Sequence, residues 1–155
     1  MRIEGRLVQG IFRERLNRFL VQVEFRGASV PCFLPNPGRL REWLAPGTVV
    51  VLREVLKEGR KTRFDVIGVS VDGRRVSIDA RVPNKVLMEV LQRREVEEFS
   101  MYSQIKPEWG YGHTRFDFLL TDGQDRCLLE VKSCTLVVGG GPSSQTRRQR
   151  GVGDI

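Results

Sequence analysis

The chain has 155 residues, with 26 lysines and arginines against 19 aspartates and glutamates, so its formal net charge is +7. Hydrophobic residues make up 40% of it, enough for the core of one ordinary domain or two small ones. No stretch approaches the roughly 18 apolar residues of a membrane-spanning helix, and the N-terminus has no apolar signal region. The basic balance favours a polyanionic partner.

The cysteine and histidine content narrows the chemistry further. The three cysteines, Cys32, Cys127 and Cys134, are an odd number without the spacing of a metal site. They predict buried, reduced thiols in a cytoplasmic protein. The single histidine, His113, excludes a histidine-rich metal centre and disfavours a Ser-His-Asp arrangement.

The first half of the chain predicts a small β-barrel. Runs rich in β-branched and aromatic residues occupy residues 6–13, 19–25, 30–34, 48–52, 64–69 and 76–79. Arg26-Gly27 and Asp72-Gly73 are expected to form hairpin turns, and residues 40–44 a short helical turn. Five or six strands in about 80 residues suggest a closed barrel. The strand pattern alone allows an OB-like or an SH3-like barrel.

A helix is expected to open the second half of the chain. Pro83 and Asn84 are suitable for a helix start, with Asn84 as the N-cap. An apolar stripe follows at helical spacing. Its members are Val86, Leu87, Val90 and Leu91. Glu89 lies within this helix.

Two strands joined by a hairpin are expected at residues 115–120 and 127–132. Because side chains alternate between faces along a strand, one face is apolar. It carries Phe116, Phe118, Leu120, Cys127, Leu129 and Val131. The other face carries Asp117, Glu130 and Lys132. A loop centred on Gly123 and Gln124 places Asp117 directly opposite Glu130, and a loop at Asp122 and Gly123 makes them diagonal neighbours.

This polar face predicts acid and metal chemistry. Directly opposed Cβ atoms lie about 5 Å apart, so Asp117 and Glu130 are suitably placed to share Mg²⁺ or Mn²⁺, which prefer oxygen ligands. Lys132 beside them is suited to hold a water or to stabilise charge on a phosphate. Glu89 and Glu108 are two further acids that could face the site. An exposed ladder of salt bridges on the strand face is the structural alternative.

The motifs in this region resemble a known family. Tyr111-Gly-His-Thr-Arg-Phe-Asp-Phe118, Leu129-Glu-Val-Lys-Ser-Cys-Thr-Leu136 and Leu34-Pro-Asn-Pro-Gly-Arg-Leu40 resemble segments of the sugar fermentation stimulation protein A family. Leu34 and Pro37 replace a Cys and a Thr of that family. The resemblance implies a mixed α+β fold, in which an N-terminal OB-like β-barrel precedes an incomplete PD-(D/E)xK nuclease-like α/β domain. It also implies DNA binding.

Carried over by position, the resemblance makes Asp117, Glu130 and Lys132 the catalytic-type residues. Asp117 and Glu130 would be the metal ligands, together with the Val131 carbonyl. The expected organisation is a DNA-binding barrel over residues 1–80, the start of the nuclease-like domain over 81–138, and an unstructured tail over 139–155.

The tail differs in character from the family. That family continues with a segment resembling Ala-Leu-Phe-Pro-Asp-Ala-Pro-Thr-Glu-Arg-Gly. With suitably chosen codons, reading this segment one base later yields the sequence from Pro142 to Ile155. We therefore expect a single-base slip near Gly139 to Gly141.

DNA contacts are expected on the barrel, and the candidates are Arg39, Arg41, Arg60, Lys61 and Arg63. Phe33 and Trp43 are the nearest aromatic side chains for base stacking, or else part of the core. Three functions stay open: a DNA-binding protein with an idle nuclease-like site, a Mg²⁺- or Mn²⁺-dependent DNA nuclease, and a barrel that binds nothing.

Overall fold

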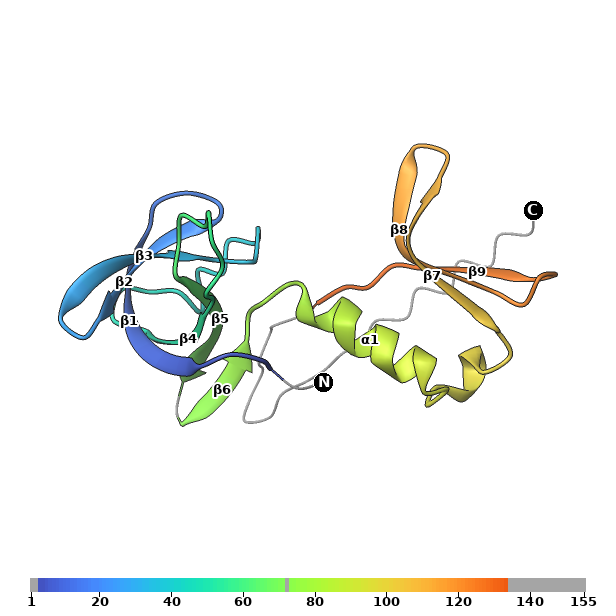
Figure 1. The fold of residues 1–155 in the computed structure, drawn as a ribbon, viewed down its shortest axis with the longest axis horizontal. Coiled ribbons are helices and arrows are strands. Elements are labelled where there is room, and N and C mark those ends of the chain that lie inside the picture. The colour runs from blue at the N-terminus through green and yellow to red at the C-terminus, as the bar shows by residue number, and fades with distance from the viewer. Residues whose placement is uncertain (1–2, 72, 134–155) are drawn as a thin grey trace.

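The computed structural model describes residues 3–71 and 73–133, which form a mixed fold of two sheets connected through one α-helix (Figure 1). The strands of the first sheet are β1 (Leu7–Arg15), β2 (Leu20–Phe25), β3 (Ala28–Phe33), β4 (Val49–Glu54), β5 (Phe64–Val71) and β6 (Arg74–Ser77). There follow α1 (Val82–Gln92), the 3₁₀ helix η1 (Glu97–Phe99), β7 (Gln104–Tyr111), β8 (Thr114–Thr121) and β9 (Arg126–Leu129). In these ranges no helix is long and apolar enough to cross a membrane.

Five strands of the first sheet close into a ring. The order is β3-β2-β1-β4-β5-β6, and β3 also pairs in parallel with β5. That closing contact joins Cys32 to Phe64 and Phe33 to Asp65. Strand β6 is attached outside the ring, to β5 alone. The ring agrees with the OB-like architecture that the family resemblance implies.

Two predicted hairpin turns are confirmed. Arg26 and Gly27 have φ of 53° and 78°, and they connect Phe25 to the directly opposite Ala28. Positive φ at both central residues is the geometry of a two-residue turn whose twist matches that of the strands. In the second hairpin Val71 pairs with Arg74, and Gly73 has φ of 74°.

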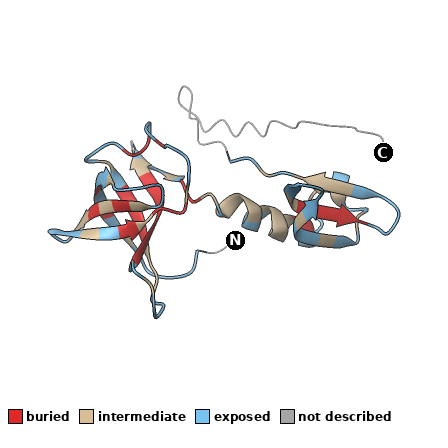
Figure 2. Ribbon diagram, turned by 90° about the horizontal axis from the view of Figure 1, so that it is seen from above, coloured by how far each residue is buried: buried red, intermediate tan, exposed pale blue. Residues whose placement is uncertain are grey.

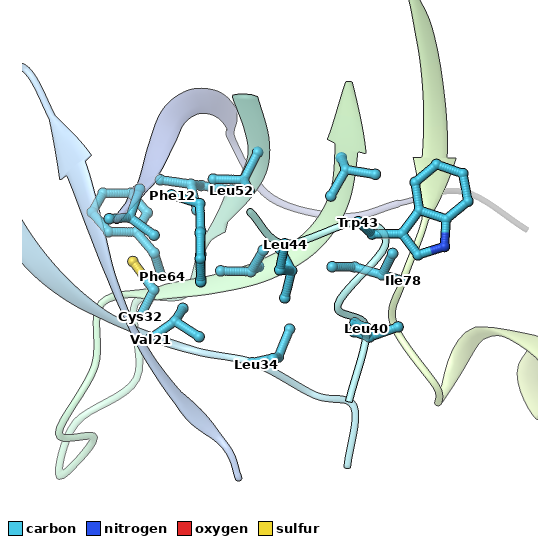
Figure 3. Close-up of a cluster of buried hydrophobic side chains, with 14 residues drawn as sticks. Phe12, Val21, Cys32, Leu34, Leu40, Trp43, Leu44, Leu52, Phe64 and Ile78 are labelled. Carbon is cyan, nitrogen blue, oxygen red and sulfur yellow. The ribbon is translucent and has the colours of Figure 1, made fainter. Parts of the chain in front are cut away.

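The core of the ring is formed by apolar side chains from every strand around it (Figure 3). The predicted helical turn is present, since the Leu44 amide donates to the Leu40 carbonyl at 2.9 Å. Trp43 on this turn is buried and belongs to the core, which removes it as a base-stacking candidate. At Gly10 a Cβ would lie only 2.5 Å from a methyl group of Val23, so the strand packing requires glycine there.

Helix α1 begins earlier than the sequence suggested. Its N-cap is Arg81 and Pro83 lies in its first turn, so the prediction of Asn84 as the N-cap was wrong. Proline is favoured in the first turn because its missing N–H would have had no helical partner there. Asn84 is therefore inside the helix, with its side chain available for another contact.

The second sheet has the order β7-β8-β9, with both pairs antiparallel. Figure 2 shows its buried residues concentrated in β8. Phe118 and Leu120 pack with Leu87, Met88 and Leu91 of α1. The helix therefore covers part of the apolar face that the sequence predicted. Phe116 on the same strand is half-buried and lies opposite Trp109. Strand β7 was not foreseen, because Pro107 and Gly110 are unusual in strands.

Candidate acidic site and nucleic-acid interface

Asp117 is held at the junction of α1, β8 and the end of β9. One of its carboxylate oxygens accepts a hydrogen bond from the Asn84 side-chain amide at 2.6 Å. The other accepts from the Val131 backbone amide at 2.7 Å. Asn84 thus connects the first turn of the helix to the Asp117 carboxylate. The sequence had suggested only that Asn84 starts the helix.

The hairpin loop is the first of the two predicted alternatives. Phe118 pairs with Leu129 and Thr121 with Arg126, so the loop is centred on Gly123 and Gln124. The paired register ends at Phe118 and Leu129, and beyond it the Val131 amide donates to the Asp117 carboxylate. Glu130 lies just beyond β9 and is exposed.

Lys132 forms an ion pair with Glu130. This hydrogen-bonded pairing, with the Coulombic effects of Glu130 and Asp117, raises the pKa of Lys132 above its ordinary value. Lys132 therefore stays protonated at neutral pH. In that state it can hold an anion or a water molecule through its N–H groups, but it cannot accept a proton.

The two further acids line a cavity of about 870 Å³ that also reaches Asp117. Glu89 enters it from α1, and Glu108 enters it from β7. Glu108 stands across from Asp117 in the strand register and has φ of 55°, a left-handed conformation that is uncommon for a glutamate. Its carboxylate pairs with Arg115 at 2.5 Å. Glu130 and Lys132 do not line this cavity.

The carboxylates around Asp117 do not gather into a larger acidic cluster among the described residues. Within residues 3–71 and 73–133, no three His, Cys, Asp or Glu side chains are grouped closely enough to hold an ion. Both carboxylates of the predicted site are occupied by hydrogen-bond or ion-pair partners. Asp117 is bound to Asn84 and to the Val131 amide, and Glu130 is paired with Lys132. Each carboxylate of the predicted site thus already has a partner within the chain.

A second feature, which we call the arginine groove, lies on the barrel. This depression of about 670 Å³ runs between the β1–β2 loop and the segment after β3. Its basic lining residues are Arg13, Arg15, Arg18, Arg39 and Arg41, and among the described residues the acid that lines it is Glu14. Arg39 and Arg41, two of the predicted DNA contacts, are exposed, and neither forms an ion pair with any residue that the structure describes.

Arg15 and Asn36 build the arginine groove. The Arg15 guanidinium donates to the carbonyls of Gly38 at 2.6 Å and of Asn36 at 3.0 Å, which fixes the loop that carries Arg39. The Asn36 side chain accepts from the Gly38 amide at 2.8 Å and donates to the Ile78 carbonyl at 2.8 Å. A Cβ at Gly38 would lie 2.9 Å from that Asn36 oxygen. The Pro-Asn-Pro-Gly motif therefore has a structural role, since its hydrogen bonds fix the loop after β3.

The other predicted DNA contacts differ in their availability. Arg60 donates to the fully buried Asp65 at 2.5 Å, and Arg63 donates to Glu54 at 2.7 Å. Both guanidinium groups are thus already paired with a carboxylate within the barrel. Lys61 between them is exposed, and no described residue pairs with it.

Sequence reasoning missed Asn84, Arg15 and Arg18. The signal for the two arginines was the spacing of basic residues through the β1–β2 turn. Arg15 and Arg18 flank Asn17, whose side chain accepts the Phe19 amide at 2.9 Å. Such an asparagine fixes a tight turn. Asn84 gave no signal in sequence beyond its helix-start position.

Comparison with known proteins gives concordant matches over both halves of the chain. Residues 14–78 match the family described as SfsA N-terminal OB domain, and residues 81–151 match the sugar fermentation stimulation protein RE domain. The second match extends into the segment for which we predicted an altered reading frame. Residues 134–155, and with them that prediction, lie outside the described residues.

Full-length relatives are longer than this chain. It is 40% identical over 153 residues to a sugar fermentation stimulation protein homolog of Caldanaerobacter subterraneus, covering 97% of this chain and 67% of that protein. A homolog from Desulforamulus reducens is 40% identical over 86% of this chain and 56% of its own length. The Pyrococcus furiosus SfsA structure in complex with Ca²⁺ is 29% identical, with a TM-score of 0.77 over 88% of this chain and 58% of that one.

Proposed function

Because the chain belongs to the sugar fermentation stimulation protein family, we propose that it binds DNA with little sequence preference through the arginine groove of its barrel. The observation that carries this proposal is the set of arginines without acidic partners at the groove. Among the residues the structure describes, Arg18, Arg39 and Arg41 line the groove and form no ion pair. Guanidinium groups free of carboxylates can bind phosphates through two parallel hydrogen bonds.

The absence of sequence preference follows from the kind of contact. Guanidinium groups that bind phosphates fix the position of the nucleic acid without reading its bases. The loop carrying Arg39 is held by Arg15 and Asn36, so little ordering is needed on binding.

The test is the salt dependence of DNA affinity in matched variants. Each lost phosphate contact should reduce the slope of log affinity against log salt by about 1, so Arg39→Ala combined with Arg41→Ala should reduce it by about 2. Arg126→Ala, at an exposed position in the second sheet, changes the net charge but should leave the slope unchanged. Absence of binding at low salt, or the same slope in all variants, would refute the proposal.

Metal-dependent DNA cleavage is a second candidate, favoured by Asp117 on β8 and by the Glu130–Lys132 ion pair just beyond β9, the strand beside it. The Pyrococcus furiosus relative was solved in complex with Ca²⁺. In this chain the carboxylates are bound to their neighbours, so the arrangement is that of an idle site. Mg²⁺ or Mn²⁺ binding would require Glu130 to leave Lys132.

Cleavage is tested on the protein with the family-like reading frame restored after residue 141. It should cut DNA only with Mg²⁺ or Mn²⁺, and Asp117→Asn should abolish cutting while DNA affinity changes by less than about twofold. Cutting that survives in the variant would exclude this site. Loss of cutting and binding together would instead indicate a folding defect.

A further inference from the structure

An exposed aromatic pair lies beside the arginine groove. Phe19, just before β2, is 42% exposed, which is high for a phenylalanine. Its ring stacks on that of Phe33 at the end of β3, with the centroids 6.2 Å apart and the planes 23° from parallel. Phe33 is half-buried, so Phe19 is the outer ring of the pair.

The Phe33 ring is held in place by two arginine side chains. The guanidinium groups of Arg60 and Arg81 lie 5.9 and 5.8 Å from the Phe33 centroid. Both arginines are in turn held by the fully buried Asp65, at 2.5 and 3.0 Å. The pairing that removes Arg60 from the phosphate contacts thus supports an aromatic surface.

The outer ring is fixed through its backbone. The Phe19 amide donates to the Asn17 side chain at 2.9 Å, and its carbonyl accepts from the Leu34 amide at 2.8 Å. A ring held in this way loses little conformational freedom when a ligand stacks on it. The solvent-facing ring is therefore preorganised.

The aromatic pair is continuous with the arginine groove. The Arg18 guanidinium lies 5.6 Å from the Phe19 centroid, and Arg18 also lines the groove with Arg39 and Arg41. A flat apolar surface thus adjoins a row of cations. This is the combination that single-stranded nucleic acids use, with bases on aromatic rings and phosphates along positive charges.

We infer that the preferred ligand is single-stranded DNA, with an unpaired base stacked on Phe19 and the adjoining phosphates in the arginine groove. The inference rests on the proposed DNA binding and specifies its substrate. In a duplex the faces of the bases are covered by their neighbours, so only an unstacked base can lie on Phe19. The ring offers no hydrogen bond, and the stacking is therefore tolerant of sequence.

The experiment compares Phe19→Ala with Tyr111→Ala, which removes another exposed aromatic side chain, 51% accessible against 42% for Phe19, from the second sheet. Affinities are measured for an oligothymidine of about 12 nucleotides and for a duplex of the same length. Loss of one stacked base should weaken single-strand binding by roughly 5- to 150-fold in Phe19→Ala. Its duplex affinity, and both affinities of Tyr111→Ala, should change by less than about twofold.

A second variant guards against a folding defect. Phe19→Trp keeps the ring, so it should retain single-strand affinity, and its exposed indole fluorescence should be quenched by oligothymidine but not by the duplex. Equal single-strand affinity in Phe19→Ala and the unmodified chain, or equal loss for both DNA forms, would overturn the inference while leaving DNA binding in place. If the unmodified chain binds neither form at low salt, the proposed function itself fails.

Discussion

The buried carboxylate of Asp65 is expected to be the most sensitive charged position in the barrel. It is fully buried, and it accepts hydrogen bonds from Arg53 at 2.7 Å, Arg60 at 2.5 Å and Arg81 at 3.0 Å. Arg81 is the N-cap residue of α1, so this cluster connects the barrel to the helix. Asp65→Asn keeps the shape of the side chain and removes the charge that balances the arginines.

The expected loss of stability in Asp65→Asn follows from how far Asp65 and its arginine partners are buried. Removing one partner of a buried ion pair costs about 3–5 kcal/mol, because the other charge is left uncompensated. Here the arginine side chains are 21–40% exposed and keep some contact with water. We therefore expect the lower end, about 3 kcal/mol, which corresponds to a fall in Tm of roughly 6–12 °C for a chain of this size.

The stability lost in Asp65→Asn should become smaller as the pH falls. Burial alone would raise the pKa of Asp65, but the hydrogen bonds from Arg53, Arg81 and Arg60 hold it below its ordinary value. A lowered pKa in the folded state stabilises the protein above the unfolded pKa of about 4, and this stabilisation is lost as the pH falls through the folded value. The difference between wild type and Asp65→Asn should thus be full at pH 7 and shrink in acid.

The assay is thermal or urea unfolding of wild type and Asp65→Asn from pH 7 down to pH 3. Asp125→Asn makes the same chemical change at an exposed residue of the β8–β9 loop and should be nearly neutral. A loss at pH 7 below about 1 kcal/mol, or one that is constant down to pH 3, would refute the argument from buried charge.

Further predictions concern packing and the acidic site. Asn84→Asp should destabilise the protein more than Asn84→Ala at neutral pH, because it sets a second negative charge against Asp117. An N-cap position would instead tolerate aspartate. The difference in stability between the two variants should disappear in unfolding curves below about pH 4. Gly10→Ala should cost about 1–3 kcal/mol through its close strand contact. Gly110→Ala, with open space around it, is the control, and equal melting of the two would contradict this. Cys32, whose pKa burial raises to about 12, should resist iodoacetamide at pH 8 until the protein is unfolded, and labelling in the native state would contradict that burial.

Sequencing of the gene through the codons of Gly139 to Gly141 tests the predicted single-base slip. An insertion or deletion that restores the family-like segment is expected. Confirmation of the present reading frame in independent isolates would exclude the slip.

The local features of the fold were readable from the sequence because each depends on neighbouring residues. Arg26 and Gly27 predicted a tight turn, since glycine readily adopts positive φ. Alternation along residues 115–120 predicted that Phe118 and Leu120 face the core. The loop centre at Gly123 and Gln124 was one of two alternatives that the sequence left open.

The tertiary structure decided which partner each polar side chain takes. Asn84 donates a hydrogen bond to Asp117, which lies 33 positions away in the chain. Arg60 donates to Asp65 and is therefore not free to bind a phosphate. The arginine groove likewise joins the turn around Arg18 to the loop around Arg39. Hydrophobic periodicity fixes only which face of an element is buried. A hydrogen bond or ion pair between distant segments depends on how the closed barrel and the helix bring those segments together, and no local pattern encodes that distance.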